Sequence, residues 1–143
     1  MKLFIDCEWN GHQGSLISMA LVAEDGDFFY EVLECPEPTD WVRVNVMPVL
    51  GKAPVSKDEF TELLREFLGR FPGDSLEVIA DWPEDIKHFC DALIAYERRN
   101  IGPGSFCITI DRELFNSQSR VPHNALEDAI ANRHYFLGRE ADE

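Results

Sequence analysis

The chain has 143 residues, which include 13 Lys and Arg and 27 Asp and Glu, and this gives a net charge of −14. The length predicts a single domain over residues 1–143, and a hydrophobic content of 45% excludes a disordered chain. So negative a surface argues against a protein that coats nucleic acid nonspecifically, although a bound divalent cation would invert the charge locally. No apolar run reaches the roughly 18 residues of a membrane span, and the early Asp6 argues against a signal peptide, so we expect a cytoplasmic protein without a membrane partner.

The first third of the chain predicts an antiparallel meander of three strands. Residues 2–8 are a short apolar run that ends in acids, and residues 16–23 are apolar nearly throughout. The Asp25-Gly26 pair is a hairpin turn signal, after which residues 28–33 return as a third strand. Residues 36–56 contain four prolines, which predicts a long irregular connection.

Helices and strands alternate in the rest of the chain. Ser56 and Glu59 form a capping box ahead of an amphipathic stripe, which predicts a helix that ends near Gly69. Residues 76–80 predict a fourth strand. Pro83 suits the first turn of a second helix, whose expected apolar stripe continues to Ile94 and whose end we place at residues 100–104.

Residues 106–110 predict a fifth strand, and residues 125–137 predict a last helix. The resulting order, βββαβαβα, predicts an α/β domain with a mixed five-stranded sheet flanked by helices. The four cysteines lack the C-x-x-C spacing of a zinc knuckle, so we expect reduced, buried thiols at Cys7, Cys35, Cys90 and Cys107.

Carboxylates stand at the predicted element ends. Asp6 and Glu8 are two residues apart on the first strand and therefore point to the same face, where they repel each other unless a cation lies between them. Glu8 has an alternative interpretation, as a marker of the strand end. Asp85 lies in the first turn of the second helix, where the helix dipole favours any acid. Asp81 competes with Asp85 as a site residue and also suits a simple helix cap.

Residues 122–129 contain the most informative cluster. Asn124 and Glu127 fit a capping box, with Asn124 as the N-cap of the last helix. His123 and Asp128 then occupy the two positions that meet in a hydrophobic staple, yet both are polar. We therefore expect an imidazole beside a carboxylate at a helix N-terminus, an arrangement that suits catalysis better than packing.

These motifs resemble the DEDDh family of 3′–5′ exonucleases, which have the ribonuclease H-like fold. Phe4-Ile5-Asp6-Cys7-Glu8-Trp9-Asn10-Gly11 resembles the first motif of the family, and His123-Asn124-Ala125-Leu126-Glu127-Asp128 resembles the third. Asp85 takes the place of the middle acid, four residues after Asp81. The whole pattern is especially similar to the small, single-domain 3′–5′ exoribonucleases of the mycobacterial type.

The resemblance implies a two-metal-ion phosphodiester hydrolase that releases nucleoside 5′-monophosphates from single-stranded 3′ ends, with RNA favoured over DNA. It implies two divalent cations, Mg²⁺ or Mn²⁺, held by Asp6, Glu8, Asp85 and Asp128, with His123 as the general base. Substrate contacts are expected at Trp9, Asn10 and Gly11. The phosphate-binding cations stay open, with candidates at Arg43, Lys52, Lys57, Arg112 and Arg120.

Two further interpretations of the sequence stay open. One is an exodeoxyribonuclease or an endonuclease of the same fold, and the other is a non-catalytic interaction module. The aromatic run Phe28-Phe29-Tyr30 leaves room for one exposed ring, which would be consistent with a homodimer contact.

Overall fold

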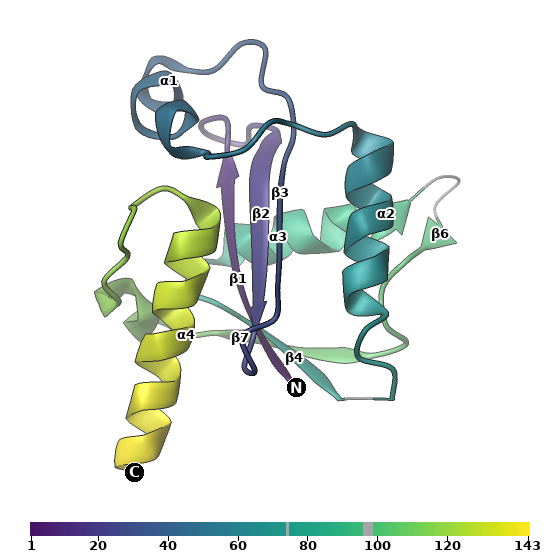
Figure 1. Cartoon of the computed structure of the whole chain (residues 1–143), viewed down its shortest axis with the longest axis vertical. Helices are drawn as coiled ribbons and strands as arrows, with labels where there is room; N and C mark the ends of the chain where they lie inside the picture. The colour runs from purple at the N-terminus through teal and green to yellow at the C-terminus, as the bar shows by residue number, and fades with distance from the viewer. Residues whose placement is uncertain (74, 96–98) are drawn as a thin grey trace.

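The structure is a computed structural model that describes residues 1–73, 75–95 and 99–143. A five-stranded mixed sheet forms its centre, in the order β3-β2-β1-β4-β7 (Figure 1). The strands are β1 (Lys2–Trp9), β2 (Leu16–Ala23), β3 (Phe28–Val32), β4 (Leu76–Ala80) and β7 (Phe106–Ile110). The predicted α/β class and the five predicted sheet strands are confirmed to within one residue at each end.

The sheet is antiparallel on one side of β1 and parallel on the other. β1 pairs with β2 and β2 with β3 in antiparallel register, so the predicted meander is confirmed. β4 pairs in parallel with both β1 and β7. β1 is therefore the central strand, and its carboxyl end points the same way as that of β4.

Helices cover both faces of the sheet (Figure 1). Helix α2 (Lys57–Leu68) and helix α3 (Pro83–Ala92) pack on one face, where Phe60, Leu64 and Phe89 join a large apolar cluster with Leu3 and Ile5. The N-cap of α2 is Ser56 and its C-cap is Gly69, as the capping signals predict.

Helix α4 (Ala125–Asp142) covers the opposite face. Ala125 and Ala129 contact the β2 residues Ala20 and Val22 in a second apolar cluster, and small side chains on both sides allow the helix to approach the sheet closely. The helix is five residues longer than predicted. The Arg133 side chain fixes it to the sheet by donating to the carbonyl of Ala23 at the end of β2.

The second helix ends earlier than predicted. α3 stops at Ala92, and Ile94–Ala95 (β5) pairs with Arg99–Asn100 (β6) in a small antiparallel ladder. The Leu93 carbonyl accepts from the Ile101 N–H at 2.9 Å, which satisfies the helix end without a further turn. Ile94 is 60% exposed instead of continuing the apolar stripe. Residues 96–98, which the predicted helix also covered, lie outside the described residues.

The connection over residues 36–56 is more regular than predicted. It contains helix α1 (Asp40–Asn45) and a 3₁₀ turn, η1 (Met47–Val49). The Thr39 hydroxyl accepts from the Val42 N–H and caps α1. A second 3₁₀ turn, η3 (Arg112–Asn116), follows β7.

The exposure of individual side chains bears on two predictions, the burial of the cysteine thiols and the exposure of one ring in the run Phe28-Phe29-Tyr30. Cys7 is buried, but Cys107 is exposed and Cys35 and Cys90 are half-buried, so the expectation of four buried thiols is wrong. Cys107 is exposed because β7 is an edge strand with little cover. Phe28 is the exposed ring of its aromatic run, at 50%. Among the described residues, no helix combines the length and the apolar character that crossing a membrane requires.

We predict that Asn124→Ala lowers the free energy of unfolding by about 2 kcal/mol. The Asn124 side chain accepts from the Glu127 N–H as N-cap of α4 and donates to the Val49 carbonyl at 2.9 Å, so the substitution removes a cap and leaves a buried acceptor unpaired. Urea unfolding measures the change. Asn116→Ala is the control, because its amide makes only an exposed contact with the Glu113 carbonyl. Equal stability of the two variants would contradict the role of Asn124.

Candidate functional site

The central strand directs two carboxylates toward α4. Phe4 packs edge-on against Phe136 of α4, with 5.4 Å between the ring centroids. Side chains two and four residues further along a strand share that face, so Asp6 and Glu8 also point toward α4. The register between β1 and β2 shifts between Glu8 and Trp9, a bulge that redirects the strand at this end.

The N-terminus of α4 brings Asp128 and His123 to the same place. Asn124 caps the helix as predicted, and Asp128 lies in its first turn. The His123 backbone N–H donates to Asp128 Oδ2 at 3.1 Å. The hydrogen bond between these residues is therefore made by the main chain of His123. Its imidazole also lies close enough to Asp128 to oppose in part the rise in pKa that burial causes, in agreement with the expected imidazole beside the carboxylate.

His123 has an uncommon backbone conformation, with φ at 71°. A non-glycine residue in the left-handed region is strained by about 1–3 kcal/mol and persists only where its surroundings hold it there. The bond to Asp128 is one such restraint. The His123 ring packs edge-on against the exposed Trp41 of α1, with 5.0 Å between the ring centroids.

Asp81 and Asp85 reach the site from β4 and α3. Phe4 pairs with Ile79 in the parallel ladder, and two residues further along each strand stand Asp6 and Asp81. Asp85, in the first turn of α3, is 2% exposed, and its Oδ1 accepts from the Cys7 N–H at 2.9 Å. This bond ties the start of α3 to the central strand.

The carboxylates meet in one cavity of about 390 Å³, which we call the acidic cavity. Two groups of carboxylates each have ligand oxygens within 4.8 Å of one another, and Asp6 belongs to both. The first group is Asp6, Asp81 and Asp85, and the second is Asp6, Glu8 and Asp128. His123 also lines this cavity. The structure therefore brings together all five of the catalytic residues predicted from the sequence, and it adds Asp81.

Burial and mutual repulsion raise the pKa values of these acids. Burial and then the charges of Asp85 and Asp128 raise the pKa of Asp6 well above its ordinary value. Burial and then Asp128 raise the pKa of Glu8 to about 8, and burial and then Asp81 raise the pKa of Asp85 to about 9. Burial also raises the pKa of Asp128. Without a cation, Glu8 and Asp85 therefore favour the protonated form up to mildly alkaline pH.

The donors of the acidic cavity suit a metal ion. Asp6 Oδ2 is buried and has no hydrogen-bond partner within the described part of the chain. A buried carboxylate oxygen without a partner is costly, and a cation would satisfy it. Since all of the candidate ligand atoms are carboxylate oxygens, the site has the donor set of a hard divalent cation.

Aromatic side chains line the acidic cavity at its mouth. Trp9 lines it as the sequence led us to expect, together with Trp82 and Phe115, which are 45% and 78% exposed. Sequence reasoning missed these last two. Trp82 follows Asp81 in the turn between β4 and α3. Its position in the sequence between Asp81 and Asp85 was the signal that could have identified it as a site residue. Phe115 lies in η3, where no periodic pattern marks it.

Asn10 and Gly11 do not belong to the residues that line the acidic cavity. The Asn10 side chain donates to the Glu37 carbonyl and accepts from the Thr39 N–H, both at 2.9 Å. Gly11 has a φ of 71°, and a Cβ there would approach the Thr39 side chain to 3.0 Å. Both residues hold the segment before α1 against the end of β1, and their predicted substrate contacts stay a prediction.

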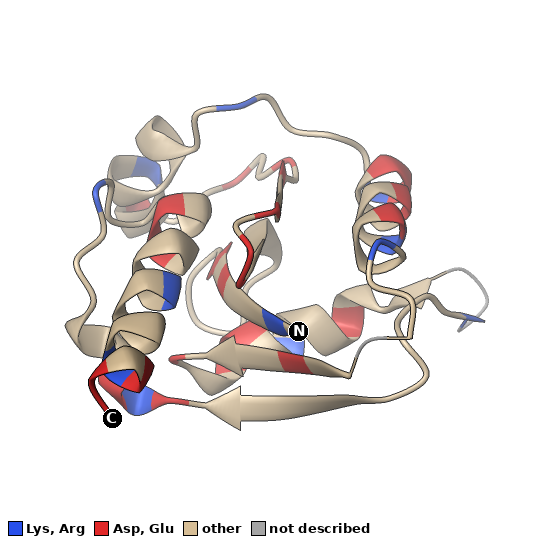
Figure 2. Cartoon of the chain, turned by 60° about the horizontal axis from the view of Figure 1, so that its bottom comes forward, with Lys and Arg blue, Asp and Glu red and all other residues tan. Residues whose placement is uncertain are grey.

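Two of the five candidate phosphate-binding cations are engaged elsewhere. Arg43 pairs with Asp40, and Lys52 pairs with Glu31. Arg112 lies beside the acidic cavity, because its guanidinium stacks 4.3 Å from the centre of the Trp82 ring and donates to the Asp81 carbonyl. Acidic residues occur along both α2 and α4 (Figure 2), so the negative charge extends well beyond the cavity.

Comparisons with known proteins do not assign the chain. A scan against protein-family models finds no match, and a search of curated proteins finds no matching relative.

We predict that the metal-free protein loses stability as the pH rises from about 5 to about 9. Glu8 and Asp85 have folded-state pKa values near 8 and 9, whereas ordinary carboxyl groups titrate near 4, so the folded state binds more protons across this range. The stability that comes from proton binding to Glu8 and Asp85 in the folded state is fully present below the ordinary carboxyl pKa. It is lost as the pH rises through the raised pKa values of these two residues. Chemical unfolding in EDTA at several pH values measures the slope.

Asp85→Asn is expected to flatten this slope, because its amide does not titrate and can still accept from the Cys7 N–H. Glu66→Gln removes one exposed acid from α2 and serves as the control, with a slope equal to that of the parent.

Millimolar Mn²⁺ should raise the melting temperature more at pH 8 than at pH 5, since the cation competes with protons for the carboxylates. A parent slope of zero would contradict the electrostatic description of the cavity.

Proposed function

We propose that this chain is a metal-dependent 3′–5′ exonuclease of the DEDDh type with a ribonuclease H-like fold, and that it acts on single-stranded 3′ ends with RNA preferred. One observation carries the proposal. Carboxylates from β1, α3 and α4 converge on Asp6 in two adjacent groups, and His123 lines the same cavity. The order of these residues along the chain matches the order of the family motifs that the sequence resembles.

The architecture supports the proposed fold. The five-stranded sheet has the strand order β3-β2-β1-β4-β7, with only β1–β2 and β2–β3 antiparallel, and this mixed arrangement is compatible with that fold. The acids lie at the carboxyl ends of the parallel strands β1 and β4, where open α/β sheets bind their ligands.

The cavity residues divide between two cation positions. Asp6 serves both, Glu8 and Asp128 complete one, and Asp81 and Asp85 are the candidates for the other. Two bound Mg²⁺ or Mn²⁺ ions would supply charge stabilisation for the phosphate oxygens and a more acidic water. The protein contributes a rigid frame, because the Cys7 N–H fixes the Asp85 carboxylate and the His123 N–H fixes that of Asp128.

His123 is the proposed general base. The imidazole of this residue accepts a proton from the attacking water, a role for which histidine is suited near neutral pH. Its strained backbone and its contact with Trp41 restrict the ring to the rim of the acidic cavity. An observed strain at a site residue supports a functional role, because structures retain such strain where geometry matters.

The exposed rings at the cavity mouth support an unpaired nucleic acid as substrate. Trp82 and Phe115 offer flat apolar faces beside the acids, and stacking on such rings contributes about 1–3 kcal/mol per base. Stacking does not depend on positive surface charge, so it suits a chain with a net charge of −14. A duplex, whose bases are already stacked, gains nothing from these rings.

We predict that Asp128→Asn abolishes Mn²⁺-dependent hydrolysis while leaving the metal-free melting temperature nearly unchanged. The substitution removes a ligand charge from the group that contains Asp6 and Glu8. The assay uses 5′-labelled and 3′-labelled RNA and DNA oligonucleotides with and without Mn²⁺. Ladders that shorten by single nucleotides from the 3′ end identify the exonuclease, whereas internal cuts identify an endonuclease.

Glu140→Gln is the matched control for Asp128→Asn, because it removes an exposed acid from the same helix at a distance from the cavity. It should retain full activity. Full activity of Asp128→Asn would reject the ligand role, and a parent chain that neither binds Mn²⁺ nor cleaves any of the oligonucleotides would favour a non-catalytic interaction module.

We predict that His123→Asn lowers the rate of hydrolysis by roughly 10²–10⁴-fold, the usual contribution of general acid–base catalysis. Asn tolerates the left-handed backbone of this position, so the variant removes the imidazole without adding strain. Mn²⁺ binding should stay near the parent level, because the carboxylates are unchanged. His134→Asn, at an exposed position of α4, is the control. A variant with the rate of the parent would exclude His123 as the base.

A further inference from the structure

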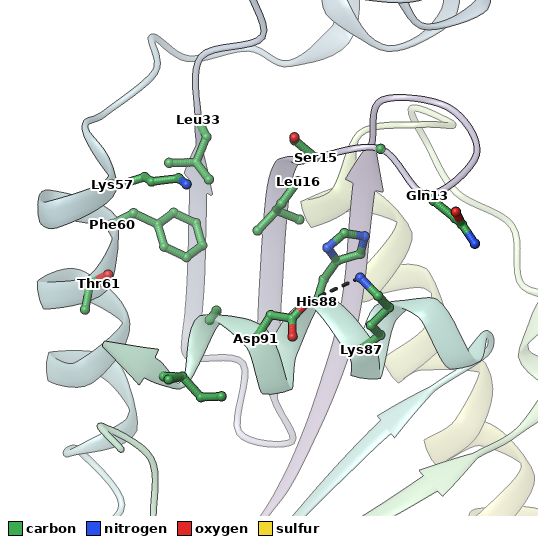
Figure 3. Close-up of a pocket in the computed structure, with 13 residues that line it drawn as sticks. Gln13, Ser15, Leu16, Leu33, Lys57, Phe60, Thr61, Lys87, His88 and Asp91 are labelled. Atoms are coloured by element: carbon green, nitrogen blue, oxygen red, sulfur yellow. Dashed lines mark hydrogen bonds and ion pairs between the residues drawn. The ribbon is translucent and has the colours of Figure 1, made fainter. Parts of the chain in front are cut away.

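A second cavity lies on the sheet face opposite to α4. It has a volume of about 440 Å³ and is lined by residues of α2 and α3, the ends of β2 and β3, and the loop before β2. Figure 3 shows Lys57 on α2 and His88 on α3 at two sides of this space, with Leu16 and Leu33 between them. None of its lining residues belongs to the carboxylate groups of the acidic cavity.

The charge of this second cavity is unusual for so acidic a chain. Lys57 and Lys87 line it, against one acid, Asp91, and the buried His88 adds an imidazole whose pKa is lowered by burial. Within the described ranges Lys57 forms no ion pair. Lys87 pairs with Asp91 at 3.3 Å, but both side chains are more than half exposed, and such pairs are weak enough to be exchanged for a ligand. We call this space the cationic cavity.

The wall between these cations is apolar. Leu16, Leu33 and Phe60 line it from three different elements, and Ile94, 60% exposed, stands at its edge. Phe60 also packs against Phe29 with 5.5 Å between the ring centroids, so the wall is part of the rigid core. Small-molecule sites usually combine apolar walls with a few polar groups, and polar and apolar residues line this cavity in about equal number.

One contact separates the two cavities. His88 is 6% exposed, and its ring lies 5.1 Å from that of Trp9 at an interplanar angle of 30°. Trp9 lines the acidic cavity, and His88 lines the cationic cavity. The two spaces therefore lie on either side of this ring pair, and their charges are opposite in sign.

We propose that the cationic cavity binds a small organic anion, whose phosphate or carboxylate group lies at Lys57 and whose apolar body lies along Phe60, Leu33 and Leu16 toward His88 (Figure 3). The Lys57 ammonium group, which forms no ion pair within the described ranges, favours the anionic head, and burial of the apolar body adds affinity in proportion to its area. This site is separate from the proposed nuclease site and does not depend on it.

Calorimetric titration in EDTA tests the proposal with four probes: hexyl phosphate, hexanoate, inorganic phosphate and 1-hexanol. Hexyl phosphate or hexanoate should bind at least about tenfold more tightly than inorganic phosphate and than 1-hexanol, because only these two carry both a charged head and an apolar chain. Which of the two binds more tightly distinguishes a phosphate ligand from a carboxylate ligand. EDTA removes divalent cations, so the anionic probes cannot bind in the acidic cavity through a metal ion.

Lys57→Gln should weaken the binding of the preferred probe about tenfold or more, as expected for the loss of a charged hydrogen-bond partner. Arg65→Gln is the matched control, since it removes an exposed cation from α2 outside the cavity, and it should leave binding unchanged. Asp128→Asn should also bind as the parent does, whatever becomes of its nuclease activity. The proposal is overturned by undetectable binding at millimolar probe, by inorganic phosphate binding as tightly as hexyl phosphate, or by a Lys57→Gln variant that binds like the control.

Discussion

The mutual repulsion of carboxylates around Asp6 is the constraint on which the rest of the structure depends. Asp6 is close to Asp85, Asp128 and Glu8, and all four pKa values are raised. A chain gains no stability from gathering like charges in a partly buried space, so the apolar packing elsewhere offsets this cost. The two apolar clusters on either face of the sheet do so, because they fix α3 and α4 to the sheet independently of the acids.

The acids are held by main-chain donors instead of by basic side chains. The Cys7 N–H bonds to Asp85 and the His123 N–H bonds to Asp128, while Asn124 and Arg133 anchor α4 to the rest of the fold. A lysine or arginine in the cavity would relieve the repulsion but would also compete with a cation. Within the described residues, Arg112 is the nearest candidate, and it engages the Trp82 ring and a carbonyl, not the carboxylates. The cavity therefore keeps its carboxylate oxygens available.

Local signals were sufficient for part of the fold and the site. Alternation and capping predicted the five sheet strands, and they placed Asp6 and Asp128 at element ends because those signals act within a few residues. The end of α3 could not be predicted, since it depends on the Ile101 N–H that reaches Leu93 from beyond the small β5–β6 ladder. The choice between Asp81 and Asp85 depends on how β4 lies beside β1, and the structure brings both acids to Asp6.

The rings of Trp9 and His88 pack against each other between the two cavities. Trp9 follows Glu8 at the bulge of β1, and His88 lies one turn after Asp85 on α3, so each ring is close in sequence to a carboxylate of the acidic cavity. Rings in contact move together in a packed interior, because interiors have little free volume. An anion that contacts His88 would therefore restrict Trp9 and the start of α3 as well. Thermodynamic linkage requires the same coupling in the opposite direction, so a cation in the acidic cavity would alter the affinity of the cationic cavity for its anion by an equal factor.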